Sequence, residues 1–190
     1  MFLTDVDGVL TNGSLIYGDN GTEAKVFNVT DGVGMILLRF AGIKTGIITA
    51  KYSSTTEKRA KEMCVTELYQ GVLNKGDVLD KLLAKYKLIA EEIAYIGDDL
   101  ADIPVLKEVG LPVTVPNAAV EVKRMVTYIT KQPGGKGAVR EVATLILKSQ
   151  GKYEKAIKDF FKQISPRSNH ANFSRNMESP NLHLRHSQIR

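Results

Sequence analysis

Short apolar runs alternate with segments of helical periodicity along most of this 190-residue chain. The runs that read as strands are residues 2–5, 45–49, 67–69, 93–96, 111–115 and 128–129. The segments with apolar residues at helical spacing are 33–40, 54–63, 75–85, 100–109 and 138–149. Because strands that alternate with helices usually pair in parallel, we expect an α/β fold, a Rossmann-like parallel sheet flanked by helices.

One segment interrupts this alternation. Residues 14–17 and 22–28 have strand character, and Gly18-Asp19-Asn20-Gly21 between them can supply the positive φ angles of a tight turn. We therefore predict a β-hairpin over residues 14–28 that projects from beside the first strand. No segment is long enough to form a separate cap domain above the sheet, so we expect a capless fold.

The composition favours one globular domain followed by a tail. The chain is 43% hydrophobic, which suits a continuous core, and its composition changes after Ile164. Residues 165–190 are rich in Ser, Asn, His and Arg and have little apolar periodicity. We predict a single domain over residues 1–164 and a flexible tail over residues 165–190.

Charge and apolar content argue against several classes of function. The net charge is +5, but residues 165–190 hold four arginines and one glutamate, and no basic run with interleaved aromatic residues occurs. We therefore expect no nucleic-acid partner. The chain has no apolar run of the roughly 18 residues that a bilayer span needs and no leader-like start, so we expect no membrane partner and a cytoplasmic location. The single Cys64 allows no internal disulfide and no zinc ligand set.

Polar residues follow four of the predicted strands, at the ends where an open parallel sheet binds ligands. They are Asp5, Asp7, Thr49, Lys51, Lys75, Asp98, Asp99 and Asp102. Taken singly, an aspartate here can cap a helix, the threonine can be an ordinary strand residue and the lysines can be solvated. Taken together, the carboxylates favour Mg²⁺, and the lysine and hydroxyl suit the oxygens of a phosphoryl group in transfer.

These residues lie in segments that resemble the four motifs of the haloacid dehalogenase superfamily of phosphohydrolases, namely DVDGVLT (5–11), IIT (47–49), Lys75 and GDDLAD (97–102). The segments FNVTDGVGM, GIITA, YQGV, AYIGDDLADIPVLKEVGLPV and PGGKGAVREV resemble, over residues 2–151, the family of 3-deoxy-D-manno-octulosonate 8-phosphate phosphatases. The resemblance implies a haloacid dehalogenase fold and a Mg²⁺-dependent phosphatase of lipopolysaccharide biosynthesis. Its substrate would be a small phosphorylated sugar acid.

The resemblance also implies catalytic roles for individual residues. Asp5 would attack phosphorus and form a phosphoaspartate. Asp7 would protonate the departing sugar oxygen and later take a proton from the attacking water. Thr49 and Lys75 would hold the phosphoryl oxygens, and Lys51 would be a further substrate contact.

For the metal, the resemblance implies that the Asp5 and Asp98 carboxylates and the main-chain carbonyl of Asp7 bind Mg²⁺. Asp99 and Asp102 would act behind these ligands or through water. A bare Asp5 carboxylate would repel a phosphate dianion, so turnover is expected to require the metal.

Three positions depart from the family pattern. Family members commonly read NVRDG, ITGR and GGRGAVRE, whereas this chain has Thr30, Ala50-Lys51 and Lys136 at the matching places. Arginine holds a carboxylate in a bidentate way that lysine and threonine do not reproduce. The natural ester therefore stays open, and a related nine-carbon sugar-acid phosphate or a broad set of small phosphate esters is the alternative.

One further expectation concerns the loop before the last predicted helix. The PGGKG loop, residues 133–137, is able to meet an anion with its backbone amides at a helix start.

Without a cap, the site is either open to a large substrate or covered by another subunit. The two exposed edges of the hairpin favour a homo-oligomer with Tyr17 and Phe27 at its interface, and the resemblance implies a homotetramer.

A receiver-type signalling domain is a remote alternative, because such domains also gather Asp, Thr and Lys around Mg²⁺ on a parallel sheet. That fold expects a phosphate-accepting aspartate at the end of the third strand. Here the third strand ends in Tyr69-Gln70-Gly71, which has no carboxylate.

Overall fold

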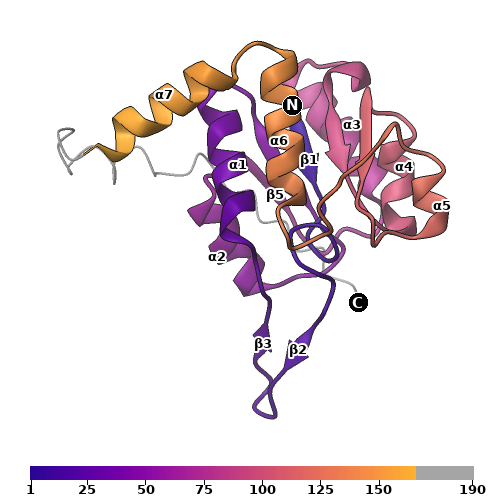
Figure 1. Cartoon of the computed structure of the whole chain (residues 1–190). Coiled ribbons are helices and arrows are strands. Elements are labelled where there is room, and N and C mark those ends of the chain that lie inside the picture. The colour runs from indigo at the N-terminus through magenta and orange to yellow at the C-terminus, as the bar shows by residue number, and fades with distance from the viewer. Residues whose placement is uncertain (166–190) are drawn as a thin grey trace.

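A six-stranded sheet forms the centre of the protein in a computed structural model that describes residues 1–165 (Figure 1). The strand order is β5-β4-β1-β6-β7-β8, and all neighbouring pairs are parallel. The strands are β1 (Phe2–Thr4), β4 (Thr45–Ile48), β5 (Glu67–Tyr69), β6 (Ala94–Ile96), β7 (Leu111–Thr114) and β8 (Tyr128–Ile129). The predicted parallel sheet is confirmed, and its order places β1 between β4 and β6.

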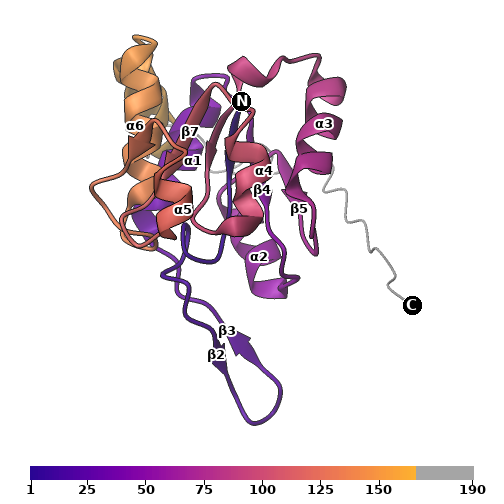
Figure 2. The same ribbon diagram turned by 90° about the vertical axis from the view of Figure 1, so that its right-hand side faces the viewer.

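Helices cover both faces of this sheet, as crossovers between parallel strands require. Helices α1 and α6 pack against each other on one face, and α3 and α4 lie on the other (Figure 2). The helices are α1 (Val29–Phe40), α2 (Ser54–Glu62), α3 (Lys75–Tyr86), α4 (Ile103–Leu106), α5 (Val120–Lys123), α6 (Ala138–Ser149) and α7 (Tyr153–Ile164). Two short 3-10 turns occupy Ala90–Glu92 and Leu100–Asp102. Because both faces are covered, the central strand β1 is apolar on both sides, with Phe2 and Leu3 fully buried.

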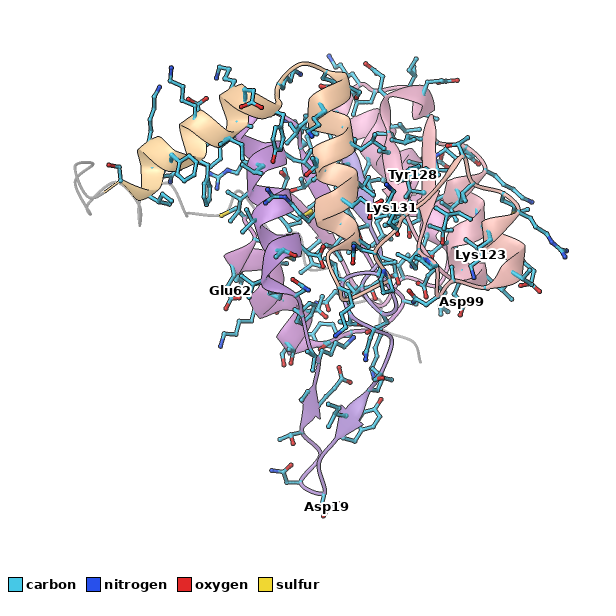
Figure 3. The ribbon with its side chains drawn as sticks, in the orientation of Figure 1. Asp19, Glu62, Asp99, Lys123, Tyr128 and Lys131 are labelled. Atoms are coloured by element: carbon cyan, nitrogen blue, oxygen red, sulfur yellow. The ribbon has the colours of Figure 1, made fainter. Side chains whose placement is uncertain are left out.

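The predicted hairpin is present but shorter than expected. Strands β2 (Ile16–Tyr17) and β3 (Glu23–Ala24) pair in antiparallel fashion, and the remainder of residues 14–28 carries no strand pairing. Two strands without a third partner hold only a short ladder. The hairpin projects well away from the body of the protein, with Asp19 at its tip (Figure 3).

Several helical segments differ from the sequence prediction, and the short helix α5 lies outside every predicted helix. The helix predicted over 100–109 is a 3-10 turn at Leu100–Asp102 followed by α4, because Asp102 turns inward and Pro104, in the first turn of α4, offers no N–H. Helix α1 begins at Val29 because the Asn28 side chain accepts a hydrogen bond from the Thr30 N–H at 2.8 Å. Helix α7 was not predicted and extends from the body beyond α6 (Figure 1).

None of the helices within residues 1–165 has both the length and the apolar content needed to cross a bilayer. The tail predicted over residues 165–190 lies outside the described residues, apart from Ser165.

Close packing of α1 on α6 yields a test of the fold. A Cβ atom on Gly34 of α1 would lie 2.9 Å from Arg140 Cα and 3.3 Å from Ala143 Cβ. We expect Gly34→Ala to lower the free energy of unfolding by about 1–3 kcal/mol, because the helices must separate, even though alanine has the higher helix propensity. Urea unfolding followed by circular dichroism measures this change.

Gly76→Ala in α3 is the matched control. There the added Cβ would lie 3.3 Å from the side-chain oxygen of Asn74 and 3.5 Å from Pro104 Cβ, and it would meet no backbone atom of another element. This variant should be at least about as stable as the wild type. Equal stability of the two alanine variants would contradict the close helix contact.

Candidate active site

A buried lysine occupies the centre of the carboxyl edge of the sheet. Lys75 is the first residue of α3, and its side chain is 2% exposed. Its Nζ donates to Asp5 Oδ1 at 2.6 Å and to Asp102 Oδ1 at 2.6 Å. Burial lowers the pKa of Lys75, but the two carboxylates outweigh that effect, so the pKa is raised and the ammonium stays charged. The lysine therefore links the residue that follows β1 to the turn that follows β6.

Asp102 is held in place from three sides. The Tyr95 hydroxyl, fully buried in β6, donates to its Oδ1. Its Oδ2 accepts from the backbone N–H groups of Asp98 at 2.8 Å and Asp99 at 3.1 Å. A Cβ on Gly97 would lie only 2.4 Å from the Asp102 carboxyl carbon, so this position needs glycine. The turn at residues 97–99 is thus folded around the Asp102 carboxylate.

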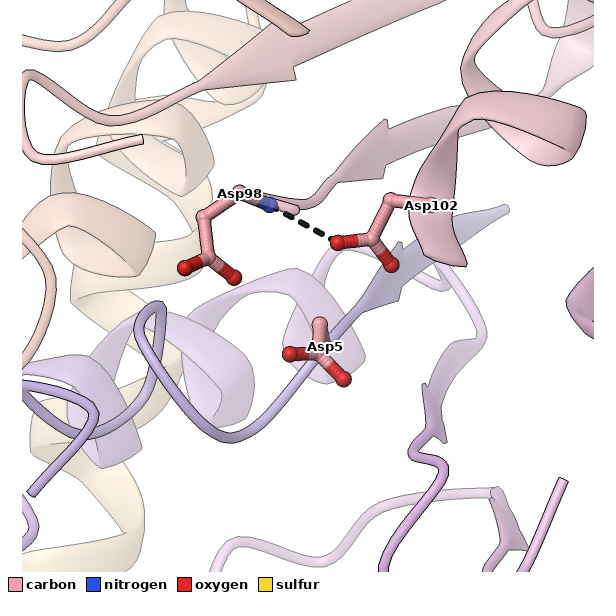
Figure 4. Close-up of side chains that lie close together, drawn as sticks. All are labelled: Asp5, Asp98 and Asp102. Carbon is pink, nitrogen blue, oxygen red and sulfur yellow. Dashed lines mark hydrogen bonds between the residues drawn. The ribbon is translucent and has the colours of Figure 1, made fainter. Parts of the chain in front are cut away.

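Three carboxylates meet beside this lysine. One oxygen each from Asp5, Asp98 and Asp102 lies within 4.8 Å of the others (Figure 4). Burial, and then the charge of neighbouring acids, raises the pKa of Asp98 to about 8, and burial raises that of Asp5 to about 6 against the effect of Lys75.

Asp98 Oδ1 is buried and has no hydrogen-bond partner among the described residues. A crowded set of acidic oxygens with a free buried oxygen matches what a hard divalent cation needs.

The loop after β1 lies directly against Asp98. Gly8 has φ +103°, and a Cβ there would lie 1.9 Å from Asp98 Oδ2. Asn117 fastens this loop, since its Nδ2 donates to the Gly8 carbonyl at 3.1 Å and its Oδ1 accepts from the Gly134 N–H at 2.8 Å. Only a residue without a side chain at position 8 lets the chain turn beneath the carboxylate.

The loop at residues 133–137 closes on the same segment, and this refines one expectation. Its amides bind protein acceptors: Gly135 N–H donates to the Val9 carbonyl at 2.9 Å and Gly137 N–H to Asp31 Oδ2 at 3.3 Å. The anion that these amides meet at the start of α6 is therefore a carboxylate of the protein itself, Asp31, and not a ligand. The loop packs on the segment that follows β1.

Asp7 is not one of the three clustered carboxylates, and its side chain contacts the hairpin. Both of its oxygens accept hydrogen bonds from Lys25 Nζ, at 2.6 and 2.7 Å. The Lys25 side chain is 1% exposed, whereas that of Asp7 is 25% exposed. Sequence reasoning missed Lys25, because a lysine in a predicted hairpin strand carries no signal that it faces an aspartate 18 positions earlier.

Thr49 and Lys51 lie at the end of β4, on the other side of β1. Thr49 is buried, and its Oγ1 accepts from the Lys51 N–H at 3.4 Å. The Lys51 ammonium contacts Glu23 Oε2 at 2.7 Å and the Tyr17 hydroxyl, both from the hairpin. Asp99 lies on the surface and caps the 3-10 turn through the Leu100 N–H (Figure 3). The structure thus gathers Asp5, Lys75, Asp98 and Asp102, and it turns Asp7 and Lys51 toward the hairpin.

The sequence of this chain is similar to those of known proteins. Residues 41–142 match the family described as haloacid dehalogenase-like hydrolases. The chain is 42% identical over 156 residues to the 3-deoxy-D-manno-octulosonate 8-phosphate phosphatase of Escherichia coli K12, and the alignment covers 82% of this chain and 83% of that protein. The chain belongs to this phosphatase family. Membership removes the receiver-type alternative.

Solved structures of the octulosonate phosphatase family superpose well on this chain. The Moraxella catarrhalis enzyme, in complex with a magnesium ion, a phosphate ion and a KDO molecule, has a TM-score of 0.81 and 42% identity, over 84% of this chain and 91% of that one. The cobalt-bound phosphatase of Haemophilus influenzae has a TM-score of 0.77 and 37% identity, over 80% and 89% of the two chains. Relatives therefore hold divalent cations on the same fold.

The crowded carboxylates predict a metal-dependent gain in stability. Saturating Mg²⁺ should raise the melting temperature, because the cation relieves the repulsion among Asp5, Asp98 and Asp102. At about 100 times the Kd the gain amounts to about 2.7 kcal/mol. Asp98→Asn should remove most of this response, and thermal unfolding with and without Mg²⁺ measures it.

Asp80→Asn on the exposed side of α3 removes the same charge away from the site. This control should keep the full Mg²⁺ response. An unchanged response in Asp98→Asn would show that the cation binds elsewhere.

Proposed function

We propose that this protein is a Mg²⁺-dependent phosphatase that hydrolyses 3-deoxy-D-manno-octulosonate 8-phosphate through a phosphoaspartate intermediate. The observation that carries the proposal is the Asp5 carboxylate, which is placed in an acidic cluster and held through one oxygen by buried Lys75. Membership in the octulosonate phosphatase family supports the substrate.

The second oxygen of Asp5 is free of Lys75 and serves as the nucleophile. It forms a bond to phosphorus as the bond between phosphorus and the sugar oxygen breaks. Asp7 donates its proton to that departing oxygen. Asp7 then accepts a proton from the water that attacks the phosphoaspartate, so inorganic phosphate leaves and the Asp5 carboxylate is restored.

The Asp5 and Asp98 carboxylates and the main-chain carbonyl of Asp7 would hold Mg²⁺, while Asp102 orients the GDD turn and Asp99 caps the turn behind it. When bound, the cation offsets the repulsion between the carboxylates and a phosphate dianion. Lys75 keeps its contacts with Asp5 and Asp102 and adds positive charge beside the phosphoryl group.

Thr49 and Lys51 complete the proposed substrate contacts. Buried Thr49 lies at the end of β4, next to β1, so its hydroxyl suits a phosphoryl oxygen. Lys51 lies further out beside the hairpin, where a sugar acid would extend from the phosphate. Phosphorylated metabolites are held inside cells, so the proposal includes a cytoplasmic location.

A related ester is the second candidate, and the three departures from the family pattern favour it. Thr30 and Lys136 line one surface groove of about 760 Å³ together with Arg140 and Lys148, and neither supplies a guanidinium. Lys51, at the third position, is engaged by Glu23. A weaker hold on the sugar carboxylate would widen the substrate range to a nine-carbon sugar acid or to small esters.

Phosphate release from a substrate panel tests the proposed function. With Mg²⁺, the value of kcat/KM for octulosonate 8-phosphate should exceed that for a nine-carbon sugar-acid phosphate and for simple phosphate esters. Chelation of the metal should abolish release. Asp5→Asn is the chemical control and should lower kcat by about 10³-fold or more, because it removes the nucleophile. Turnover that survives in Asp5→Asn would contradict the mechanism, and a preference for another ester would select the second candidate.

We also propose that the protein is a homotetramer assembled through its hairpins. Exposed apolar side chains gather on and next to the hairpin, namely Leu15, Ile16, Tyr17, Val26 and Val29. An exposed apolar patch beside open strand edges favours association with another copy. A neighbouring subunit would then cover a site that this chain leaves without a cap.

Mass measurement tests the assembly. Ile16→Glu combined with Val26→Glu should convert the oligomer to a smaller species, because charge at both positions opposes burial of the hairpin. Light scattering after size exclusion gives the mass. Val120→Glu, at an exposed apolar position on α5, is the control and should keep the wild-type mass. A monomeric wild type would contradict the proposal.

A further inference from the structure

Lys25 connects the hairpin to Asp7 in the segment that follows β1. It follows β3 directly, and its side chain is 1% exposed. Its Nζ lies 2.6 Å from Asp7 Oδ1 and 2.7 Å from Asp7 Oδ2, and 3.9 Å from Glu23 Oε1. The ammonium therefore contacts both oxygens of one carboxylate.

A buried ammonium is stable only when a partner compensates for the loss of water. Asp7 is that partner, and its own side chain stays 25% exposed. Lys25 thus approaches the carboxylate from the protein side, and the outer side remains accessible to a substrate. Each carboxylate oxygen has two lone-pair directions, so a hydrogen bond from Lys25 to each leaves one direction per oxygen for a proton.

We propose that Lys25 is a positioning residue for the proton-transfer step, which rests on the function proposed above for Asp7. The bidentate contact fixes the plane of the Asp7 carboxylate and thereby the direction in which it delivers a proton to the departing sugar oxygen. Lys25 itself neither touches the substrate nor exchanges a proton with it. A free carboxylate would rotate about its side-chain bonds and spend less time in the reactive geometry.

The hairpin stem, which comprises residues 16–17 and 23–25, makes this contact. Glu23, paired with Tyr17 across the hairpin, lies 3.9 Å from the Lys25 ammonium and 2.7 Å from the Lys51 ammonium. The stem therefore reaches both the proton donor, through Lys25, and the proposed substrate contact Lys51. The hairpin would therefore take a direct part in orienting the proposed active site.

The leaving group separates positioning from a merely structural role. A sugar alkoxide leaves poorly and needs a proton from Asp7 as its bond to phosphorus breaks, whereas p-nitrophenolate leaves without one. Because kcat/KM reports the steps up to the first transfer, a defect in Asp7 orientation lowers kcat/KM for the sugar ester far more than for p-nitrophenyl phosphate. General damage to the fold or to metal binding lowers both alike.

The experiment compares kcat/KM for octulosonate 8-phosphate and p-nitrophenyl phosphate at saturating Mg²⁺ in the full chain. Lys25→Met should lower the value for the sugar ester by about 100-fold and that for the aryl ester by less than about fivefold. Lys25→Arg, which can still donate to both oxygens, should return most of the loss. The same Met substitution in an Asp7→Asn background should add little, because Lys25 acts through Asp7.

Lys85→Met is the matched control. Lys85 in α3 forms an ion pair at 2.5 Å with Glu67 in β5, in which the carboxylate is 3% and the lysine 38% exposed, and it is not among the proposed catalytic or binding residues. Its loss should leave the ratio of the two kcat/KM values at the wild-type level even if the melting temperature falls.

The outcomes separate the inference from the proposed function. Equal loss for both esters in Lys25→Met, or a further large loss in the Asp7→Asn background, overturns the role of Lys25. If Lys25→Met does not fold, Lys25→Gln replaces it, because glutamine keeps a hydrogen-bond donor at this buried position. The same ratio of the two kcat/KM values is then measured in Lys25→Gln. A wild type that hydrolyses neither ester overturns the proposed phosphatase function instead.

Discussion

The contact of one buried ammonium with two carboxylates organises the candidate active site. Lys75 binds Asp5 and Asp102 at once, and so ties the residue after β1 to the turn after β6. A buried charge of either sign alone would be strongly destabilising, so each of the three groups requires the others. The pairing sets where the proposed nucleophile points, and it leaves Asp98 as an acid whose neighbours are mostly negative.

Excess negative charge at this edge shapes the surrounding backbone. Gly97 gives room to Asp102, and Gly8 gives room to Asp98, at positions where any Cβ would collide with a carboxylate. Asn117 and the loop at residues 133–137 then hold the Gly8 segment in place through backbone contacts. Close approach of main chain and acid is what a small hard cation requires, since its ligands are oxygens from several chain segments.

The hairpin serves two purposes in the proposed enzyme. Its apolar side chains favour assembly with other copies, and its stem places Lys25 and Glu23 against Asp7 and Lys51. In the proposed assembly these two purposes are connected, because a hairpin packed against other copies would be a rigid support for Asp7, the proposed proton donor. A two-stranded element is only weakly stable by itself, so such packing would also stabilise the hairpin.

The alternation of strands and helices determined the parallel sheet, and the sheet determined that Asp5, Thr49, Lys75, Asp98 and Asp102 lie along one edge. That inference needed no tertiary detail, because the carboxyl ends of parallel strands necessarily lie together. Only the folded chain decided that Asp7 faces Lys25, that the amides of residues 133–137 bind the protein, and that Asp102 breaks the predicted helix into a 3-10 turn. These features depend on the register of the hairpin, on the direction of side chains and on competition for hydrogen-bond partners. Contacts between distant segments determine all three, so no periodic pattern in the sequence indicates them.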